Sequence, residues 1–248
     1  MKKLISFVLG LVTLTTSAQD NKVWRIGIQF GSSGNISKYS SGMPTANARF
    51  NHNVFQAPNI DLVARYDLNK HWMIMTGIGV NDFGFGYSIS ENYSLANAKI
   101  RTSDIKTDFV AVEFPLTLFY KFNPNCKNVS WIVGGGYVTT LIDKETIDMD
   151  FSINGEGNST NYLSSQSSSN GGAAILLRWS IGREKTYRNG SILQASFMAN
   201  IGFNTIASST VNYTLDNQNY SHDFSNTGSS VGFRLAYFLK PFGNNNHN

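Results

Sequence analysis

The sequence predicts an all-β protein, an eight-stranded antiparallel up-and-down transmembrane β-barrel. Apolar residues recur at every second position in eight segments, which is the pattern of strands with one apolar face and one polar face. The connections between these segments alternate between long and short. Aromatic residues gather near one end of the segments. Together these observations favour a sheet that crosses a membrane.

The two-residue period justifies each strand in turn. In order, the predicted strands are residues 24–30, 60–68, 72–80, 110–120, 129–142, 173–181, 193–203 and 231–239. In every segment but the fifth, the apolar residues lie on one face. In chain order these faces include Trp24 and Ile28, Ile60 and Leu62, Trp72 and Ile78, Val112 and Leu116, Ile175 and Leu177, Phe197 and Ile201, and Phe233 and Leu235. The fifth segment is rich in glycine, and its pattern leaves its facing open. No segment carries a helical period.

The lengths of the connections discriminate between a soluble sandwich and a membrane barrel. The long connections are residues 31–55, 88–105, 143–170 and 205–226, and the short ones are residues 67–70, 123–128 and 183–190. A soluble sandwich has no reason to place every long loop at one end. A transmembrane barrel has short periplasmic turns and longer extracellular loops. The alternation therefore predicts a barrel with both termini on the periplasmic side.

Aromatic residues support the same orientation. Indole and phenol rings settle at the bilayer boundary, because they are apolar in body and polar at the tip. We expect a periplasmic-side aromatic girdle made of Trp24, Tyr66, Trp72, Tyr120, Trp131, Trp179 and Tyr237.

The opposite face of the strands carries charges that point into the barrel. Eight strands close around an interior that side chains just fill. We expect a paired lumen charge network made of Arg25, Asp61, Arg65, Glu113, Arg178 and Arg234. Arginines outnumber carboxylates in this set, which leaves room for an anion or for Asp67 and Asp82. Pro115 cannot donate to the sheet, so a local break in pairing is expected there.

Composition excludes several other classes. The chain has 248 residues, of which 13% are aromatic and 15% charged, the opposite of a disordered protein. Its mean hydropathy is −0.19, and no uninterrupted apolar run reaches about 18 residues, which argues against membrane helices. One cysteine excludes an intrachain disulfide framework. The net charge of +4 is a weak argument for nucleic acid, and we expect no nucleic-acid partner.

The first residues have the features of an export signal. Met1-Lys2-Lys3 is positively charged, residues 4–14 are apolar, and Thr16-Ser17-Ala18 supplies small residues for cleavage. We therefore expect a signal peptide over residues 1–18 and an outer-membrane barrel domain over residues 19–248.

The fourth strand carries a family resemblance. Residues 112–122, VEFPLTLFYKF, resemble the EIPLLLKY strand of the PorT-like outer-membrane β-barrel family of Bacteroidetes. Glu113, Pro115, Leu116 and Tyr120 stand at matching positions. Residues 131–137 resemble the next strand of that family. The resemblance implies an outer-membrane barrel, usually of unassigned activity, although one namesake takes part in type IX secretion.

The sequence gives little sign of catalytic or metal chemistry. His52, His71, His222 and His247 share no metal-ligand spacing, and we expect no cofactor, no metal and no catalytic residue. The third long connection is acidic, which is compatible either with calcium or lipopolysaccharide bridging or with a plain solvated loop. Its acidic residues are Asp143, Glu145, Asp148, Asp150 and Glu156. Residues 164–170 form a serine-rich, low-complexity stretch that we expect to be flexible.

Three functions remain open, and the first is favoured. It is a non-enzymatic outer-membrane barrel with a filled polar lumen, whose long extracellular loops serve membrane stabilisation or contact with partners. The second is a narrow pore for small solutes, in which arginines set a preference for anions. The third is an enzyme that modifies outer-membrane lipid. The expected partners are outer-membrane lipid and other envelope proteins, and the expected state is a monomer.

Overall fold

The computed structural model describes residues 23–39, 48–53, 55–91, 102–122, 129–154, 160–215 and 218–241. They form β1 (Val23–Tyr39), β2 (Ala48–Asn53), β3 (Phe55–Asp67), β4 (Trp72–Glu91), β5 (Thr102–Phe122), β6 (Val129–Ile142), β7 (Thr146–Asn154), β8 (Thr160–Ser169), β9 (Gly172–Thr186), β10 (Ile192–Gly202), β11 (Ala207–Leu215) and β12 (Gln218–Phe238). Within these residues, no helix is long and apolar enough to cross a bilayer. The expected signal peptide over residues 1–18 lies outside the described residues.

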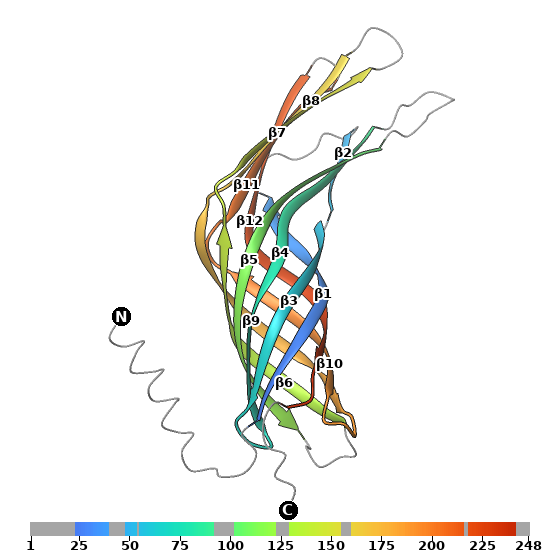
Figure 1. Ribbon diagram of the computed structural model, residues 1–248. Helices are drawn as coiled ribbons and strands as arrows, with labels where there is room; N and C mark the ends of the chain where they lie inside the picture. Colours follow the sequence, from blue (N-terminus) through green and yellow to red (C-terminus); the bar gives the residue numbers. More distant parts are fainter. Residues whose placement is uncertain are drawn as a thin grey trace, which may run out of the picture.

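Eight of the strands close into a barrel (Figure 1). Their order around the wall is β1, β3, β4, β5, β6, β9, β10 and β12, and β12 pairs with β1 to complete the ring. Every pairing is antiparallel, and each barrel strand neighbours the next barrel strand along the chain. The predicted eight-stranded up-and-down barrel is therefore confirmed, and each predicted strand falls on one of these eight.

The long connections differ from the expected polar loops, because strands continue through them. β7 pairs with β8, β8 with β11, and β11 with the upper part of β12, so a four-stranded sheet rises from the barrel (Figure 1). On the other side, β2 pairs with the upper part of β4. The expectation of a flexible stretch at residues 164–170 is wrong, since residues 164–169 lie in β8. Backbone pairing on both sides orders β8 whatever its side chains, and the Ser167 and Ser209 hydroxyls add a hydrogen bond of 2.7 Å.

β12 changes partner at residues 227–229. The part of β12 within the barrel pairs with β10 from Ser230 to Phe238. The part that precedes it in the chain pairs with β11 from Gln218 to Asn226. The register with β1 shifts at the same level. Gly228 adopts a φ of 77°, and its N–H donates to Asn226 Oδ1 at 2.7 Å. This irregularity lets one strand belong both to the barrel and to the four-stranded sheet that rises from it.

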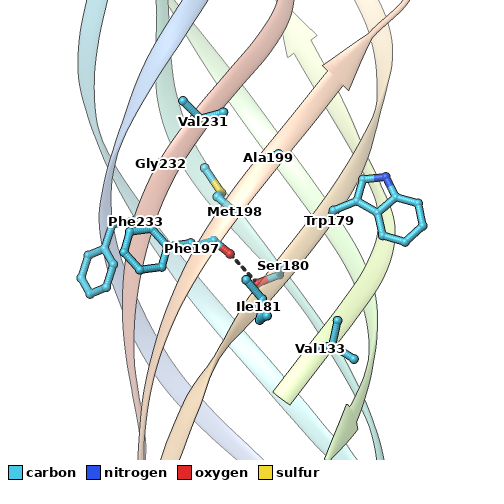
Figure 2. Close-up of a pocket in the computed structure, with 10 residues that line it drawn as sticks. All are labelled: Val133, Trp179, Ser180, Ile181, Phe197, Met198, Ala199, Val231, Gly232 and Phe233. Carbon is cyan, nitrogen blue, oxygen red and sulfur yellow. Dashed lines mark hydrogen bonds between the residues drawn. The ribbon is translucent and has the colours of Figure 1, made fainter. Parts of the chain in front are cut away.

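The outer face of the barrel is apolar. Phe197 is 67% exposed and Ile175 is 65% exposed, whereas the alternate residues Arg178 and Asn200 are buried. A groove of about 630 Å³ lies in this outer face across β6, β9, β10 and β12 (Figure 2). Its lining residues are Val133, Trp179, Ser180, Ile181, Phe197, Met198, Ala199, Val231, Gly232 and Phe233. The groove is part of the apolar outer wall and not of the lumen.

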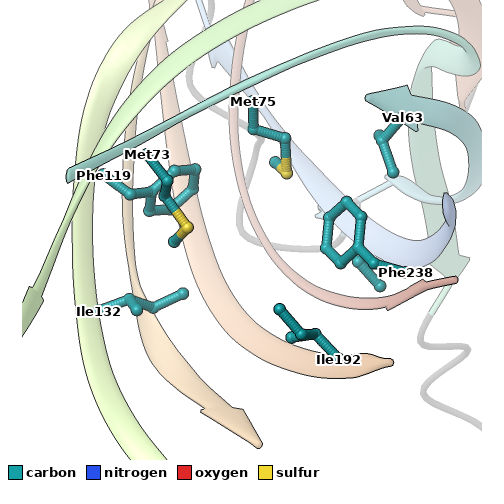
Figure 3. Close-up of a cluster of buried hydrophobic side chains, with 8 residues drawn as sticks. Val63, Met73, Met75, Phe119, Ile132, Ile192 and Phe238 are labelled. Carbon is teal, nitrogen blue, oxygen red and sulfur yellow. The ribbon is translucent and has the colours of Figure 1, made fainter. Parts of the chain in front are cut away.

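Two clusters of apolar side chains fill parts of the lumen. The cluster at the end of the short turns contains Val63, Met73, Met75, Phe119, Ile132, Ile192, Ala236 and Phe238 (Figure 3). The cluster toward the opposite end, from which the four-stranded sheet rises, contains Phe83, Ala111, Val138, Ile142, Leu176 and Ile206. Each of these side chains is at most 7% exposed. The barrel therefore has an apolar layer near each end of its interior.

Pro115 interrupts the sheet on one side only. The pairing of β4 with β5 runs to Thr76 opposite Leu116 and resumes at Gly79 opposite Glu113. The register is the same on both sides of the gap, so there is no bulge. The pairing with β6 passes through Pro115 without a shift. The expected local break is confirmed, and the Thr76 hydroxyl donates to the Pro115 carbonyl at 2.9 Å across it.

Replacing Gly228 by Ala is expected to destabilise the barrel. A left-handed backbone costs a residue with a Cβ about 1–2 kcal/mol, and the new Cβ would lie 3.0 Å from Leu176 and 3.1 Å from Ile206. The free energy of unfolding should therefore fall by about that amount or more in urea titrations of the folded protein in lipid vesicles, followed by tryptophan fluorescence. Gly135→Ala is the control, because its nearest neighbour is Trp179 at 3.5 Å. Equal stability of the two variants would contradict the prediction.

Candidate functional site in the barrel lumen

Four charged side chains from four strands meet in the middle of the lumen. Arg178 Nη2 lies 3.1 Å from Glu113 Oε2, and Arg234 Nη2 lies 3.3 Å from the same oxygen. Arg234 Nη1 lies 2.5 Å from Asp61 Oδ2. All four side chains are at most 4% exposed. Two guanidinium groups thus face two carboxylates, and the central cluster (Asp61, Glu113, Arg178 and Arg234) is electrically balanced.

Amide side chains supply part of the hydrogen bonding of the central cluster, while Asp61 Oδ1 and Arg234 Nε have no partner within the described residues. Gln29 Nε2 donates to Asp61 Oδ2 at 2.7 Å, and Asn81 Nδ2 donates to Glu113 Oε1 at 2.9 Å. Arg178 Nε donates to Asn200 Oδ1 at 2.9 Å. Buried charges are tolerable only when such hydrogen bonds accompany the ion pairs. The surrounding amides therefore make this cluster compatible with a buried position.

A second charged group, the lower cluster, lies nearer the short turns. Arg65 Nη1 lies 2.7 Å from Glu184 Oε2, and Arg65 Nε donates to Asp67 Oδ1 at 2.8 Å. Lys121 Nζ lies 2.5 Å from Glu184 Oε1, and Arg25 pairs with Asp67. The Arg65 guanidinium also lies over the ring of Phe238, 5.7 Å from its centroid. Three cations and two carboxylates give the lower cluster (Arg25, Arg65, Asp67, Lys121 and Glu184) a net charge of +1.

The six residues expected to form one lumen network fall into these two clusters. Asp61, Glu113, Arg178 and Arg234 meet in the central cluster, whereas Arg25 and Arg65 belong to the lower cluster. Among the side chains that the structure describes, no ion pair joins the two.

Carboxylates of the protein balance most of the arginine excess. Asp67 takes part, as the sequence allowed, and Asp82 forms no ion pair among the described residues. Sequence reasoning missed Glu184, because it ended the sixth strand at Ile181 whereas β9 runs to Thr186. Continuing the two-residue period from Arg178 would have placed Glu184 inside the barrel.

Several buried polar groups of the lumen lack a protein partner among the described residues, and some of them lie on β1, β3 and β4. Ser33 Oγ, Asn81 Oδ1 and both amide atoms of Asn59 are buried and have no hydrogen-bond partner within the described part of the protein. Buried polar atoms of native proteins are nearly always hydrogen-bonded, to protein or to water. We therefore expect ordered water to bind here, beside the central cluster.

Six of the seven aromatic residues expected in the girdle lie within two residues of a strand end on the short-turn side. They are Trp24, Tyr66, Trp72, Tyr120, Trp131 and Tyr237. Trp179 lies seven residues from the end of β9. Neighbouring rings touch, with Trp24 and Tyr66 centroids 4.6 Å apart and Trp72 and Tyr120 centroids 4.9 Å apart. Their role at the bilayer boundary stays a prediction.

The acidic connection offers no assembled cation site among the described residues. No group of three His, Cys, Asp or Glu side chains there is close enough to hold a metal ion. Asp148 instead accepts a hydrogen bond of 3.0 Å from Gln166 Nε2. His52 and His247 have no described side chains, and His71 Nδ1 lies 3.2 Å from the Lys121 carbonyl oxygen.

Comparison with known proteins identifies the family. Residues 17–208 match the sequence model of the outer membrane protein beta-barrel domain family. The chain belongs to this family. Membership places the protein in an outer membrane. The PorT-like resemblance is narrower than this family and stays a prediction.

Solved structures with a similar arrangement of strands are also outer membrane proteins. OprG from Pseudomonas aeruginosa is 12% identical, with 88% of this chain and 96% of that chain covered and a TM-score of 0.46. AlkL, solved by solid-state NMR in DMPC lipid bilayers, is 14% identical, with 92% and 95% covered and a TM-score of 0.39. Ail of Yersinia pestis is 14% identical, with 87% and 99% covered and a TM-score of 0.34. No curated protein compared with this chain matches it.

Replacing Gly79 by Ala is expected to break the central cluster. A Cβ at this position would lie 1.7 Å from Asp61 Oδ1, so the carboxylate would have to leave Arg234 and Gln29. Separating a buried ion pair in this way costs about 3 kcal/mol or more. The loss should appear in the free energy of unfolding in urea. Gly135→Ala is again the matched control, and a Gly79→Ala variant as stable as this control would contradict the assigned geometry.

Replacing Glu184 by Gln is expected to destabilise the lower cluster. The substitution leaves Arg65 without its shortest ion pair and removes the carboxylate from Lys121. Arg65 would keep only its ion pair with Asp67, and removing one partner of a buried ion pair costs about 3 kcal/mol, which the same urea titration measures. Glu145→Gln removes an equal charge from an exposed position and should change stability by less than about 0.5 kcal/mol. Similar effects of the two substitutions would exclude a structural role for the Glu184 ion pairs.

Proposed function

We propose that this protein is a non-enzymatic outer-membrane barrel with a closed lumen, which holds an extracellular sheet in place for contact with partner proteins. The observation that carries the proposal is the filling of the lumen, where the central ion-pair cluster lies between two apolar layers and the lower cluster lies at the short-turn end. In this proposal the barrel holds the protein in the membrane, and the sheet above it makes the contact with partners.

The central cluster supports the closed lumen. A solute crossing it would have to separate Glu113 from Arg178 and Arg234, which hold it from two strands. Charges in a medium of low dielectric constant attract strongly, and removing one partner leaves the other uncompensated. The apolar clusters above and below add layers that an ion cannot enter with its water. These features favour a barrel that does not conduct.

The extracellular strands support the role in partner contact. β7, β8, β11 and the upper part of β12 form a sheet that rises from one end of the barrel (Figure 1). A barrel that served only to span the membrane would not need these additional strands. The proposal assigns no reaction, cofactor or metal to the chain. It includes export by a leader over residues 1–18, a monomeric state and the narrower PorT-like kinship.

Conductance in a planar lipid bilayer tests the closed lumen. The wild-type protein is expected to show no unitary current steps. A variant with Glu113, Arg178 and Arg234 all changed to Ala removes the central ion pairs and is expected to raise ion leakage. The control carries Ala in place of Arg183 and Lys185, which are exposed on β9 and should leave the wild-type behaviour unchanged.

The opposite result supports the narrow pore. Repeatable current steps from the wild-type protein, with a preference for anions, would overturn the closed lumen. In that case the arginines of both clusters would line a hydrated path. Gel mobility of boiled and unboiled samples shows that each variant has folded into a barrel before its currents are compared.

A further inference from the structure

One edge of the extracellular sheet is unpaired. β7 pairs with β8 along Thr146–Asn154, and no other strand of the described residues pairs with its opposite edge. An edge strand presents a row of backbone N–H and C=O groups that another chain can use. β7 therefore offers a strand edge nine residues long.

The hydrogen bonds of β7 show which of its backbone groups point away from β8. The Ser169 N–H donates to the Glu145 carbonyl at 2.9 Å, so this pair is hydrogen-bonded. In antiparallel pairing, hydrogen-bonded and non-hydrogen-bonded pairs alternate. The register then directs the N–H and C=O groups of Asp148, Asp150 and Ser152 to the open edge.

Proline and lysine, two common protections of an edge strand, are absent from β7, whose only charges are the carboxylates of Asp148 and Asp150. Its sequence, TIDMDFSIN, contains no proline, lysine or glycine, the residues that commonly discourage strand addition. The upper part of β5, which pairs only with β4 above Ala111, carries the exposed Lys106. β7 is thus more receptive than the upper edge of β5.

The charges on β7 select the kind of partner. Asp148 and Asp150 are exposed and lie on one face of the strand, while the less exposed Ile147 and Met149 lie on the other. A second copy of β7 would bring like charges opposite one another, which is unfavourable. A strand with Lys or Arg at alternate positions would place them opposite the two carboxylates.

From these features we infer that the open edge of β7 binds an extended basic segment of a partner protein by β-strand addition. The inference rests on the proposed role of the extracellular sheet in partner contact. Backbone hydrogen bonds to the edge give affinity, and alternate side chains of the partner give specificity. Basic residues face Asp148 and Asp150, and apolar residues face Ile147 and Met149.

Binding of a strand peptide to the full protein in nanodiscs of neutral lipid tests the inference. The probe is a fluorescent nine-residue peptide of alternating lysine and valine, followed by anisotropy. We expect saturable binding that weakens with salt. Peptides with glutamate in place of lysine, or with N-methyl groups on the amides that face β7, should not bind.

Variants of the edge separate backbone pairing from charge attraction. Ser152→Pro removes an outward N–H and should weaken binding about tenfold, whereas the control Ser152→Ala should bind like the wild type. Changing both Asp148 and Asp150 to Asn should weaken binding and remove most of its salt dependence. The boiled and unboiled gel mobilities confirm that each variant retains its barrel.

Two results would overturn the inference. One is the absence of peptide binding to the wild-type protein, and the other is equal binding to Ser152→Pro and Ser152→Ala. Neither result bears on whether the lumen conducts. Conversely, current steps in a bilayer would overturn the proposal of a closed lumen but would not affect the inference about the β7 edge. The two failures are therefore distinguishable.

Discussion

The need to pair every backbone N–H and C=O inside the membrane governs the rest of this structure. Hydrocarbon offers no hydrogen bonds, so a sheet can span it only when β12 returns to pair with β1 and no edge remains. Closure then turns the usual pattern of a soluble protein inside out. Apolar residues such as Phe197 face outward, and charged residues such as Arg178 face inward. An interior of eight strands is narrow enough that these inward side chains must fit and pair with one another.

Above the membrane the constraint is relaxed, and the sheet opens. At Gly228, β12 leaves β10 and takes β11 as its partner, so the wall continues as a sheet with an edge at β7. Water can satisfy the free backbone groups of β7, which is why an edge is tolerated there. The same edge would be prohibitive within the hydrocarbon. The position of Gly228 thus separates the part of the chain that must be closed from the part that can bind another strand.

The barrel could be predicted from the sequence because the outer face of every strand is apolar and its period is two. The extracellular strands could not, because serine and asparagine in β8 and β11 give no apolar signal and their order comes from backbone pairing. The division of the charged lumen residues into two clusters could not be predicted from the sequence either. Which carboxylate meets Arg65 depends on strand register and on the end of β9, and neither is written in the local pattern. The sequence pattern predicted that these charged side chains face inward, but it could not predict which of them form ion pairs.

The two clusters differ in balance, and their positions explain the difference. The central cluster is neutral and lies where no side chain is more than 4% exposed, so an extra charge there would have no compensation. The lower cluster has one cation in excess, and its members Lys121 and Asp67 are each 15% exposed at the end of the short turns. Water at that end can share the charge. In the proposed closed barrel, the ion pairs that stabilise the middle of the lumen are the same ones that obstruct passage through it, which links the stability of the barrel to the closure of its lumen.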